Sequence, residues 1–189
     1  MLIRRERPSD DAAIRAVTAA AFATVPHSAP PVEADGVPGE ATLVGWLRSD
    51  ASWIPELSLV ACLGDDVVGH VVCTRADVDG APALGLGPVS VRPDHQQRGV
   101  GSALMHAVLG AADALGEPLV ALVGDPAFYS RFGFVSGSSL GIEAPDPGLS
   151  PYFQARPLSA YEPSLTGRFR FAAPFDALEA AASGGGSGH

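Results

Sequence analysis

The chain has 189 residues, of which 47% are hydrophobic, so it is long enough to bury the core of a single domain. Its 12 arginines stand against 21 acidic residues, and the net charge of −9 argues against a nucleic-acid-binding protein, whose affinity depends on clustered basic side chains. No apolar run approaches the roughly 20 residues of a membrane-spanning helix, and residues 1–5 turn polar too early for a secretory signal, so we expect no membrane partner and a cytoplasmic location.

The first half of the chain predicts a short strand, two helices and three longer strands. The helices are separated by a sixteen-residue, proline-rich acidic loop over 24–39, a length that is typical of lids and binding loops. In chain order, we expect a strand around Ile3, a helix with Ile14, Val17, Ala21 and Phe22 on one face, a helix over 40–48, and strands over 57–63, 67–76 and 84–91.

The strand over 84–91 leads into a glycine-rich turn and a helix. Pro93 ends the strand, Gly99 and Gly101 punctuate the turn, and apolar residues recur at helical spacing from Ala103 to Leu115. Glycines let several backbone N–H groups converge without a Cβ in the way, and the first turn of a helix carries the positive end of its dipole. The pattern therefore predicts an anion-binding turn, with a tight strand-to-helix turn of no further function as the alternative.

Three kinds of glycine loop compete for this turn. A P-loop needs a lysine after its second glycine, and the chain contains no lysine. A dinucleotide-binding fingerprint requires a third small residue where Leu104 stands. The third pattern, Gln/Arg-x-x-Gly-x-Gly/Ala after a strand, is matched by Gln96, Gly99 and Gly101. Together with Val89-x-Val91-x-Pro93, this turn resembles that of the GNAT N-acetyltransferase superfamily, whose members hold the pyrophosphate of acetyl-CoA there.

The rest of the chain predicts alternating strands and loops. We expect a strand over 119–123 parallel to the 84–91 strand, a short helix over 125–132, a strand from Phe134, a long loop over 137–151, and a strand over 152–156. Residues 169–178 are expected to pack at a place that the pattern does not assign. We expect one domain over 1–178, with a C-terminal extension from about 160, and a flexible tail of linker composition over 179–189. The fold class is α/β (α+β), and the order of elements over roughly 1–160 resembles the GNAT fold, a mixed and mostly antiparallel sheet flanked by helices.

A second motif lies downstream, in Gly124-Asp125-Pro126-Ala127-Phe128-Tyr129-Ser130-Arg131-Phe132-Gly133-Phe134. Tyr-x-x-x-Gly-Phe is similar to the other GNAT signature, in which the tyrosine lies near the cofactor sulfur. The version with Gly-Asp-Pro before the tyrosine resembles a bacterial subgroup of uncharacterised GNAT proteins. It departs from the commoner arrangement with an asparagine further upstream, so no cofactor role carries over to Asp125.

The resemblance implies an acyltransferase that moves an acetyl group from acetyl-CoA directly to an amine in a ternary complex. The backbone N–H of Val89 or Val91 would polarise the thioester carbonyl, and Tyr129 would protonate the departing thiolate. The alternative for Tyr129 is a packing role beside its aromatic neighbours. Main-chain N–H groups would hold the pyrophosphate at Gly99, Val100, Gly101 and Ser102, and Arg98 is either a phosphate contact or a solvated side chain.

The general base is the open question of this site. Many family members carry a glutamate on the central strand, but residues 86–91 include no acid. Glu40 is the substitute that we consider, acting through water, with favourable charge at a helix N-terminus as the alternative role. His70 is expected to be a core histidine, and His27 lies in the 24–39 loop. Cys62 and Cys73 show no metal-ligand spacing, so we expect buried thiols and no metal.

The acceptor is expected to be a small primary amine bound between the loops over 24–39 and 137–151. One alternative is a protein N-terminus or side chain, which would need an open groove. The other is a non-catalytic acyl-CoA-binding module, because the central strand lacks the family's acid. A homodimer is compatible with the sequence.

Overall fold

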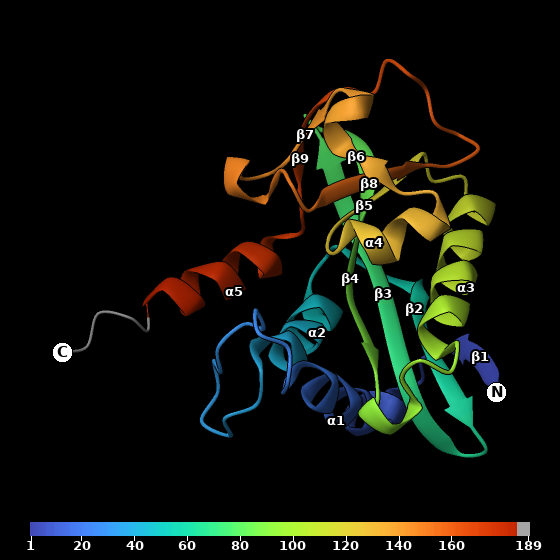
Figure 1. The fold of residues 1–189 in the computed structure, drawn as a ribbon, viewed down its shortest axis with the longest axis vertical. Helices are drawn as coiled ribbons and strands as arrows, with labels where there is room; N and C mark the ends of the chain where they lie inside the picture. Colours follow the sequence, from blue (N-terminus) through green and yellow to red (C-terminus); the bar gives the residue numbers. More distant parts are fainter. Residues whose placement is uncertain (185–189) are drawn as a thin grey trace.

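The computed structural model of the chain describes residues 1–184. Its sheet has nine strands, and all neighbouring pairs on the main path are antiparallel except β4 and β5, which are parallel. This confirms the predicted mixed, mostly antiparallel sheet (Figure 1). The main path is β1 (Leu2–Arg5), β2 (Trp53–Leu63), β3 (Asp66–Val78), β4 (Ala81–Val91), β5 (Leu119–Val123), β8 (Phe153–Pro157) and β6 (Val135–Ser136).

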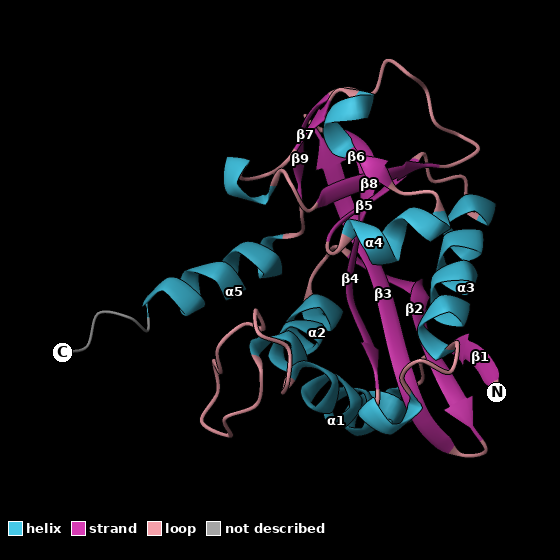
Figure 2. Ribbon diagram, in the orientation of Figure 1, coloured by secondary structure: helices cyan, strands magenta, loops and turns pink. Residues whose placement is uncertain are grey.

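Helices cover both faces of the sheet because its strands alternate apolar side chains between them. In β2, Leu59 and Ala61 pack in the cluster that contains α3 (Val100–Ala114). Their neighbours Val60 and Cys62 pack in the cluster beneath α1 (Asp11–Phe22) and α2 (Gly39–Ser49). Figure 2 shows α3 apart from α1 and α2, with α5 (Ala173–Gly184) beyond α2 and the short α4 (Pro126–Tyr129) near the upper half of α3.

Two predicted segments are wrong in detail. The loop over 137–151 contains two 3₁₀ turns and the two-residue strand β7 (Ile142–Glu143), which pairs with β9 (Gly167–Arg170). Residues 179–184 continue α5 instead of starting a tail, because this stretch consists mainly of good helix formers and follows Leu178, which is buried. Residues 185–189 of the expected tail lie outside the described residues.

The feature that positions the site is the separation of β4 from β5. They pair only at Leu84–Val120 and Gly85–Ala121. Beyond Gly85, the edge of β4 that faces away from β3 has no strand beside it in the described part of the chain. An unpaired strand edge presents backbone N–H and C=O groups to whatever molecule lies there.

Candidate active site where β4 and β5 diverge

The backbone of Val89 and Val91 faces this open edge. Arg92 donates its N–H to the Val68 carbonyl of β3 at 2.9 Å. Successive N–H groups of a strand point to opposite edges, so the N–H groups of Val89 and Val91 point away from β3. The Gln96 side chain agrees, because its Nε2 donates to the Val91 carbonyl at 3.1 Å from the open side. Gln96 therefore supports the turn through the backbone of β4.

The turn before α3 exposes a group of backbone donors. Gln97 and Gly99 have positive φ values of 59° and 83°, which turn the chain sharply into the helix. The first internal bond runs from the N–H of Ala103 to the carbonyl of Gly99. Within residues 1–184, no hydrogen bond from the N–H groups of residues 97–102 to the protein is found. Together with the helix dipole, these donors suit a phosphate or diphosphate. The Arg98 side chain is exposed beside them.

Tyr129 lies on α4, directly after the end of β5. Its ring lies over Gly124, so close that a side chain there would clash with it, and it packs edge-to-face on Phe128 and Phe134. Burial, with a smaller contribution from the Asp125 carboxylate, raises the pKa of Tyr129 to about 12. Its hydroxyl has no hydrogen-bond partner among the described residues. Tyr129 therefore packs against its aromatic neighbours and also keeps a hydroxyl without a protein partner in the described chain.

The two sequence motifs pack on each other. A Cβ at Gly101 would lie 3.6 Å from Val91 and 3.9 Å from the ring of Phe128. Further along α3, His106 packs edge-to-face on Phe132 with ring centroids 5.2 Å apart. The start of α3 thus lies beside both β4 and α4. The structure brings Val89, Val91, the donors of residues 98–102 and the aromatic patch of Tyr129 to one place.

Glu40 lies elsewhere, in the first turn of α2, on the opposite face of the sheet from α3. Its Oε1 accepts the N–H of Ala29 at 2.7 Å, which ties the 24–39 loop to the start of α2. Its Oε2 is buried and has no partner within the described chain. Burial raises the pKa of Glu40, against the opposing effect of the backbone N–H groups. The carboxylate is therefore both a loop tether and a group with one free oxygen.

The two loops expected to flank the acceptor do not face each other. The 24–39 loop packs at α2, whereas residues 142–143 pair with β9 at the other end of the molecule, and Figure 1 shows α5 between them. Helix α5 therefore separates the two loops, and the binding of the acceptor between them stays a prediction. Sequence reasoning missed Phe171 and Phe175, which lie beside β4; the repeated phenylalanines at 169, 171 and 175 were the available signal.

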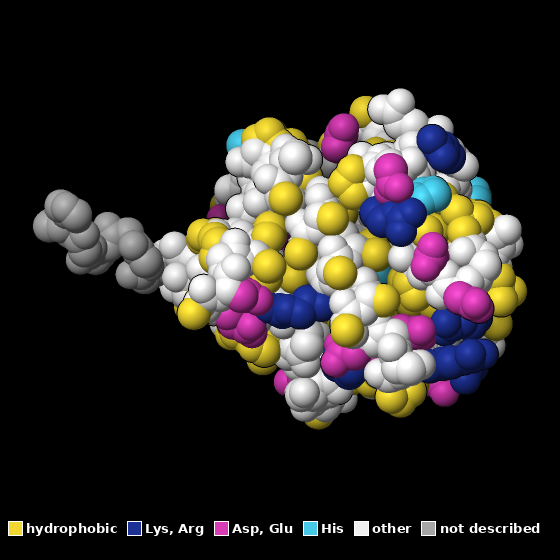
Figure 3. Space-filling model, turned by 90° about the horizontal axis from the view of Figure 1, so that it is seen from below, with side chains coloured by type: hydrophobic (Ala, Val, Ile, Leu, Met, Phe, Trp, Pro, Cys, Tyr) yellow, Lys and Arg dark blue, Asp and Glu magenta, His cyan; other side chains and the backbone are white. Residues whose placement is uncertain are grey.

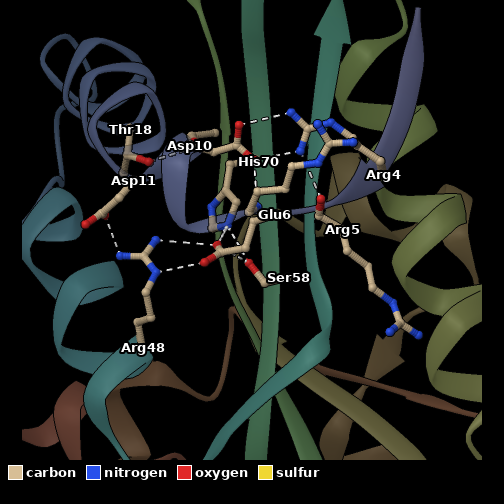
Figure 4. Close-up of polar contacts among 11 residues, drawn as sticks. Arg4, Arg5, Glu6, Asp10, Asp11, Thr18, Arg48, Ser58 and His70 are labelled. Carbon is tan, nitrogen blue, oxygen red and sulfur yellow. Dashed lines mark hydrogen bonds and ion pairs between the residues drawn. The ribbon is translucent and has the colours of Figure 1, made fainter.

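A second polar cluster is buried away from this edge (Figure 4). His70 on β3 is fully buried, as expected, and its Nε2 lies 2.9 Å from the Ser58 hydroxyl. Ser58 donates to Glu6 at 2.5 Å, so Nε2 of His70 carries the proton and donates to Ser58, while Nδ1 has no partner in the described structure. Arg48 of α2 also binds Glu6, at 2.8 Å. The cluster joins the end of β1 to β2, β3 and α2 around the fully buried His70, which indicates a structural role.

Charges on the surface are interspersed. On the face shown in Figure 3, arginine and acidic side chains lie next to each other. Arg15, for example, pairs with Glu33 and Asp35, and Arg92 pairs with Asp94. Cys62 and Cys73 are buried and unbonded, and burial raises the pKa of the Cys73 thiol. Residues 1–184 contain no cluster of three potential metal ligands.

Of the helices in residues 1–184, none has both the length and the apolar character needed to cross a bilayer.

Comparisons with known proteins agree with this geometry. A family model described as "Acetyltransferase (GNAT) domain" matches residues 55–136, which include both motifs. The uncharacterised N-acetyltransferase YhbS of Escherichia coli K12 is 33% identical over 164 residues, which cover 84% of this chain and 88% of the relative. The uncharacterised N-acetyltransferase YjhQ of the same strain is 33% identical over 147 residues, covering 74% and 81%.

Two solved structures are also similar. The crystal structure of the GNAT family N-acetyltransferase YhbS from Escherichia coli in complex with CoA has a TM-score of 0.79 and 30% identity, over 93% of this chain and 91% of the other. The structure of a GNAT family acetyltransferase from Brucella melitensis in complex with acetyl-CoA has a TM-score of 0.73 and 33% identity, over 93% and 97%.

Proposed function

The chain belongs to the GNAT superfamily of N-acetyltransferases, and on that premise we propose that it transfers the acetyl group of acetyl-CoA to a small primary amine by direct attack in a ternary complex. The observation that carries this proposal is the group of unpaired N–H donors at residues 97–102 next to the open edge of β4. Complexes of similar proteins with CoA and acetyl-CoA support the choice of acyl donor.

Each part of the site has one task in this reaction. The donors at Gly99, Val100, Gly101 and Ser102 bind the diphosphate, with Arg98 as an exposed cation beside them. The open edge of β4 pairs with the amides of the pantetheine arm, as an added strand does. An N–H of Val89 or Val91 stabilises the negative charge that develops on the carbonyl oxygen. The amine nitrogen bonds to the carbonyl carbon, loses a proton, and the carbon–sulfur bond breaks.

Tyr129 is the group that we assign to the departing thiolate. A thiol has an ordinary pKa of about 8.5, so complete proton transfer from a phenol with a pKa of about 12 is uphill. A hydrogen bond from the protonated hydroxyl to the sulfur still stabilises its developing charge. The raised pKa keeps that donor protonated at every physiological pH. The expected catalytic acid is thus better described as a hydrogen-bond donor to the leaving group.

Glu40 is our candidate for the base. Its Oε2, which has no partner in the described chain, and its raised pKa suit the removal of a proton from the acceptor ammonium, directly or through water, and this leaves the neutral amine that attacks the thioester. Its place on the α1–α2 face, opposite α3, matches an acceptor that approaches from the side away from the diphosphate. The cytoplasmic location and a homodimer remain predictions.

Calorimetry with acetyl-CoA, followed by thiol release with a panel of amines, tests the proposal. We expect one acetyl-CoA per chain and turnover with small primary amines. The Gly101→Val variant should bind acetyl-CoA at least about tenfold more weakly, because a branched side chain obstructs the phosphate turn. Binding without turnover on any amine would favour the non-catalytic module, turnover on peptides alone would favour a protein acetyltransferase, and no binding would defeat all three.

A further inference from the structure

The C-terminal segment begins at a fixed anchor. Strand β9 pairs with β3 at Asp77–Arg170 and Val78–Phe169. The Arg170 guanidinium adds an ion pair with Asp77, with Nη2 and Oδ1 2.8 Å apart. The chain then enters α5 within a few residues. The start of α5 is therefore held against the sheet by backbone pairing and by charge.

A row of four aromatic rings crosses from the sheet to α5. The centroids of Phe153, Phe169, Phe171 and Phe175 are 5.4, 4.8 and 5.0 Å apart in succession. A Cβ at Gly85 would lie 2.7 Å from Phe171, and one at Gly87 would lie 3.9 Å from Phe175. The absence of a side chain at Gly85 is what lets the row lie on β4, where β4 and β5 separate.

The middle of α5 is anchored at α2. Leu178 is buried, and a Cβ at Gly39 would lie 2.7 Å from it. Residues three apart share a helix face, so Phe175 and Leu178 point to the same side. The first half of α5 thus reaches from the diverging edge of β4 to the start of α2, where Glu40 and Ala29 lie.

Phe171 and Phe175, together with the start of α2, form the surface that an acceptor would contact, and we call this surface the aromatic wall. In the proposed reaction the diphosphate occupies the α3 face, so the amine approaches the thioester from the face of α1, α2 and α5. Phe171 and Phe175 are only partly buried there, and Glu40 is the acidic group tied to the same corner. Aromatic rings attract both flat apolar groups and ammonium ions, and the carboxylate adds charge complementarity for a cation.

We infer that Phe175, with Phe171 behind it, determines acceptor specificity, and that the acceptor is a primary amine carried on an aromatic or other flat apolar group. The inference rests on the proposed function and deepens it. The chemistry of this wall disfavours amino alcohols, whose hydroxyl groups would lose hydration against the rings without gaining hydrogen-bond partners.

Thiol release with 2-phenylethylamine and with ethanolamine tests this inference on the full chain. The wild type should prefer 2-phenylethylamine. Phe175→Ala should lower kcat/KM for 2-phenylethylamine about tenfold, mainly through KM, and for ethanolamine by less than about twofold, because only the aromatic acceptor packs on the ring. Glu179→Ala, an exposed change on the same helix, is the matched control and should alter neither value.

Calorimetry with acetyl-CoA separates this inference from the proposed function. Phe175→Ala should bind acetyl-CoA as the wild type does. Unchanged acceptor preference in a variant that still binds and turns over acetyl-CoA would overturn the inference and leave the function intact. If thermal unfolding shows that Phe175→Ala does not fold, Phe175→Leu takes its place, and equal losses for both amines in that variant would equally overturn the inference.

Discussion

The substitution of Tyr129 by phenylalanine distinguishes the packing role of the ring from the role of the hydroxyl. Tyr129→Phe keeps the packing on Phe128 and Phe134 but removes the proposed hydrogen-bond donor to the thiolate. We expect kcat to fall about 100-fold, the lower end of what a positioned proton donor contributes, with acetyl-CoA affinity unchanged. Because the pKa is about 12, the wild-type rate should show no alkaline decline from Tyr129 up to pH 10. Full turnover in the variant would leave Tyr129 with packing alone.

Glu40 poses a similar question, because the loop tether and the proposed base are the same carboxyl group. Glu40→Gln keeps an oxygen that can accept the Ala29 N–H, so the 24–39 loop should remain in place. We expect kcat/KM to fall about 100-fold. The increase of the rate with pH that results from deprotonation of the Glu40 carboxyl should also disappear. A pH–rate profile measured from pH 5 to 9 gives the result. An unaltered profile would show that Glu40 only holds the loop.

At the scale of elements, the cluster around His70 ties β1, β2, β3 and α2 together. Burial opposes ionisation of Glu6, but hydrogen bonds from His70, Arg48 and Ser58 outweigh it and lower the pKa of Glu6 to about 2. Its contribution to stability is therefore present above its ordinary pKa of 4.5 and is lost as the pH falls toward 2. Burial lowers the pKa of His70, with Glu6 opposing and Arg48 supporting that change.

The lowered pKa of His70 affects the stability of the fold over a different pH range from that of Glu6. Below the ordinary value of 6.5 the unfolded chain binds a proton that the buried, neutral His70 does not, so the folded state loses stability as the pH falls from 6.5. His70→Gln keeps a donor toward Ser58 and removes the titrating group. We expect its free energy of unfolding in urea to change less between pH 7 and pH 5 than that of the wild type. Parallel pH dependences in the two proteins would contradict a neutral His70.

Elements with strong periodicity were predictable, and those that depend on distant partners were not. The helix of α3 and the parallel strand β5 followed from apolar spacing and glycine placement. The predicted strand over 57–63 starts four residues later than β2, which accommodates Pro55 because this proline falls in a register shift between Trp53 and Ser58. β9 was not predictable, because its four residues gain partners only in β7 and at the far end of β3.

The same reasoning applies to the site. The motif around Gly99 and Gly101 predicts the phosphate turn because its chemistry is local to one strand–turn–helix unit. The aromatic wall was hidden because it depends on Gly85 and Gly39 accepting side chains from residues more than eighty positions later. Such close approaches exist only in the folded chain.

At the scale of the whole molecule, the proposed function assigns acyl-donor binding to one face of the sheet and acceptor selection to the other, with the divergence of β4 and β5 between them. The α3 face contains the phosphate turn, and its core cluster includes no residue of α5. The opposite face is completed by α5, through Phe175 and the buried Leu178. Binding of acyl donor and selection of acceptor should therefore be separable by removing one element.

A chain that ends at Ala172, without α5, tests this separation. It should remain folded, because the cluster beneath α3 is intact, but lose about 2–4 kcal/mol of unfolding free energy with the burial of Leu178 and Phe175. Acetyl-CoA should bind within about twofold of the full chain, because its proposed contacts lie on α3 and β4, while the preference for aromatic amines should disappear. Calorimetry and the two-amine assay measure both effects. Loss of acetyl-CoA binding in a folded, shortened chain would show that α5 supports the phosphate turn through the sheet, and the two faces would then act as one unit.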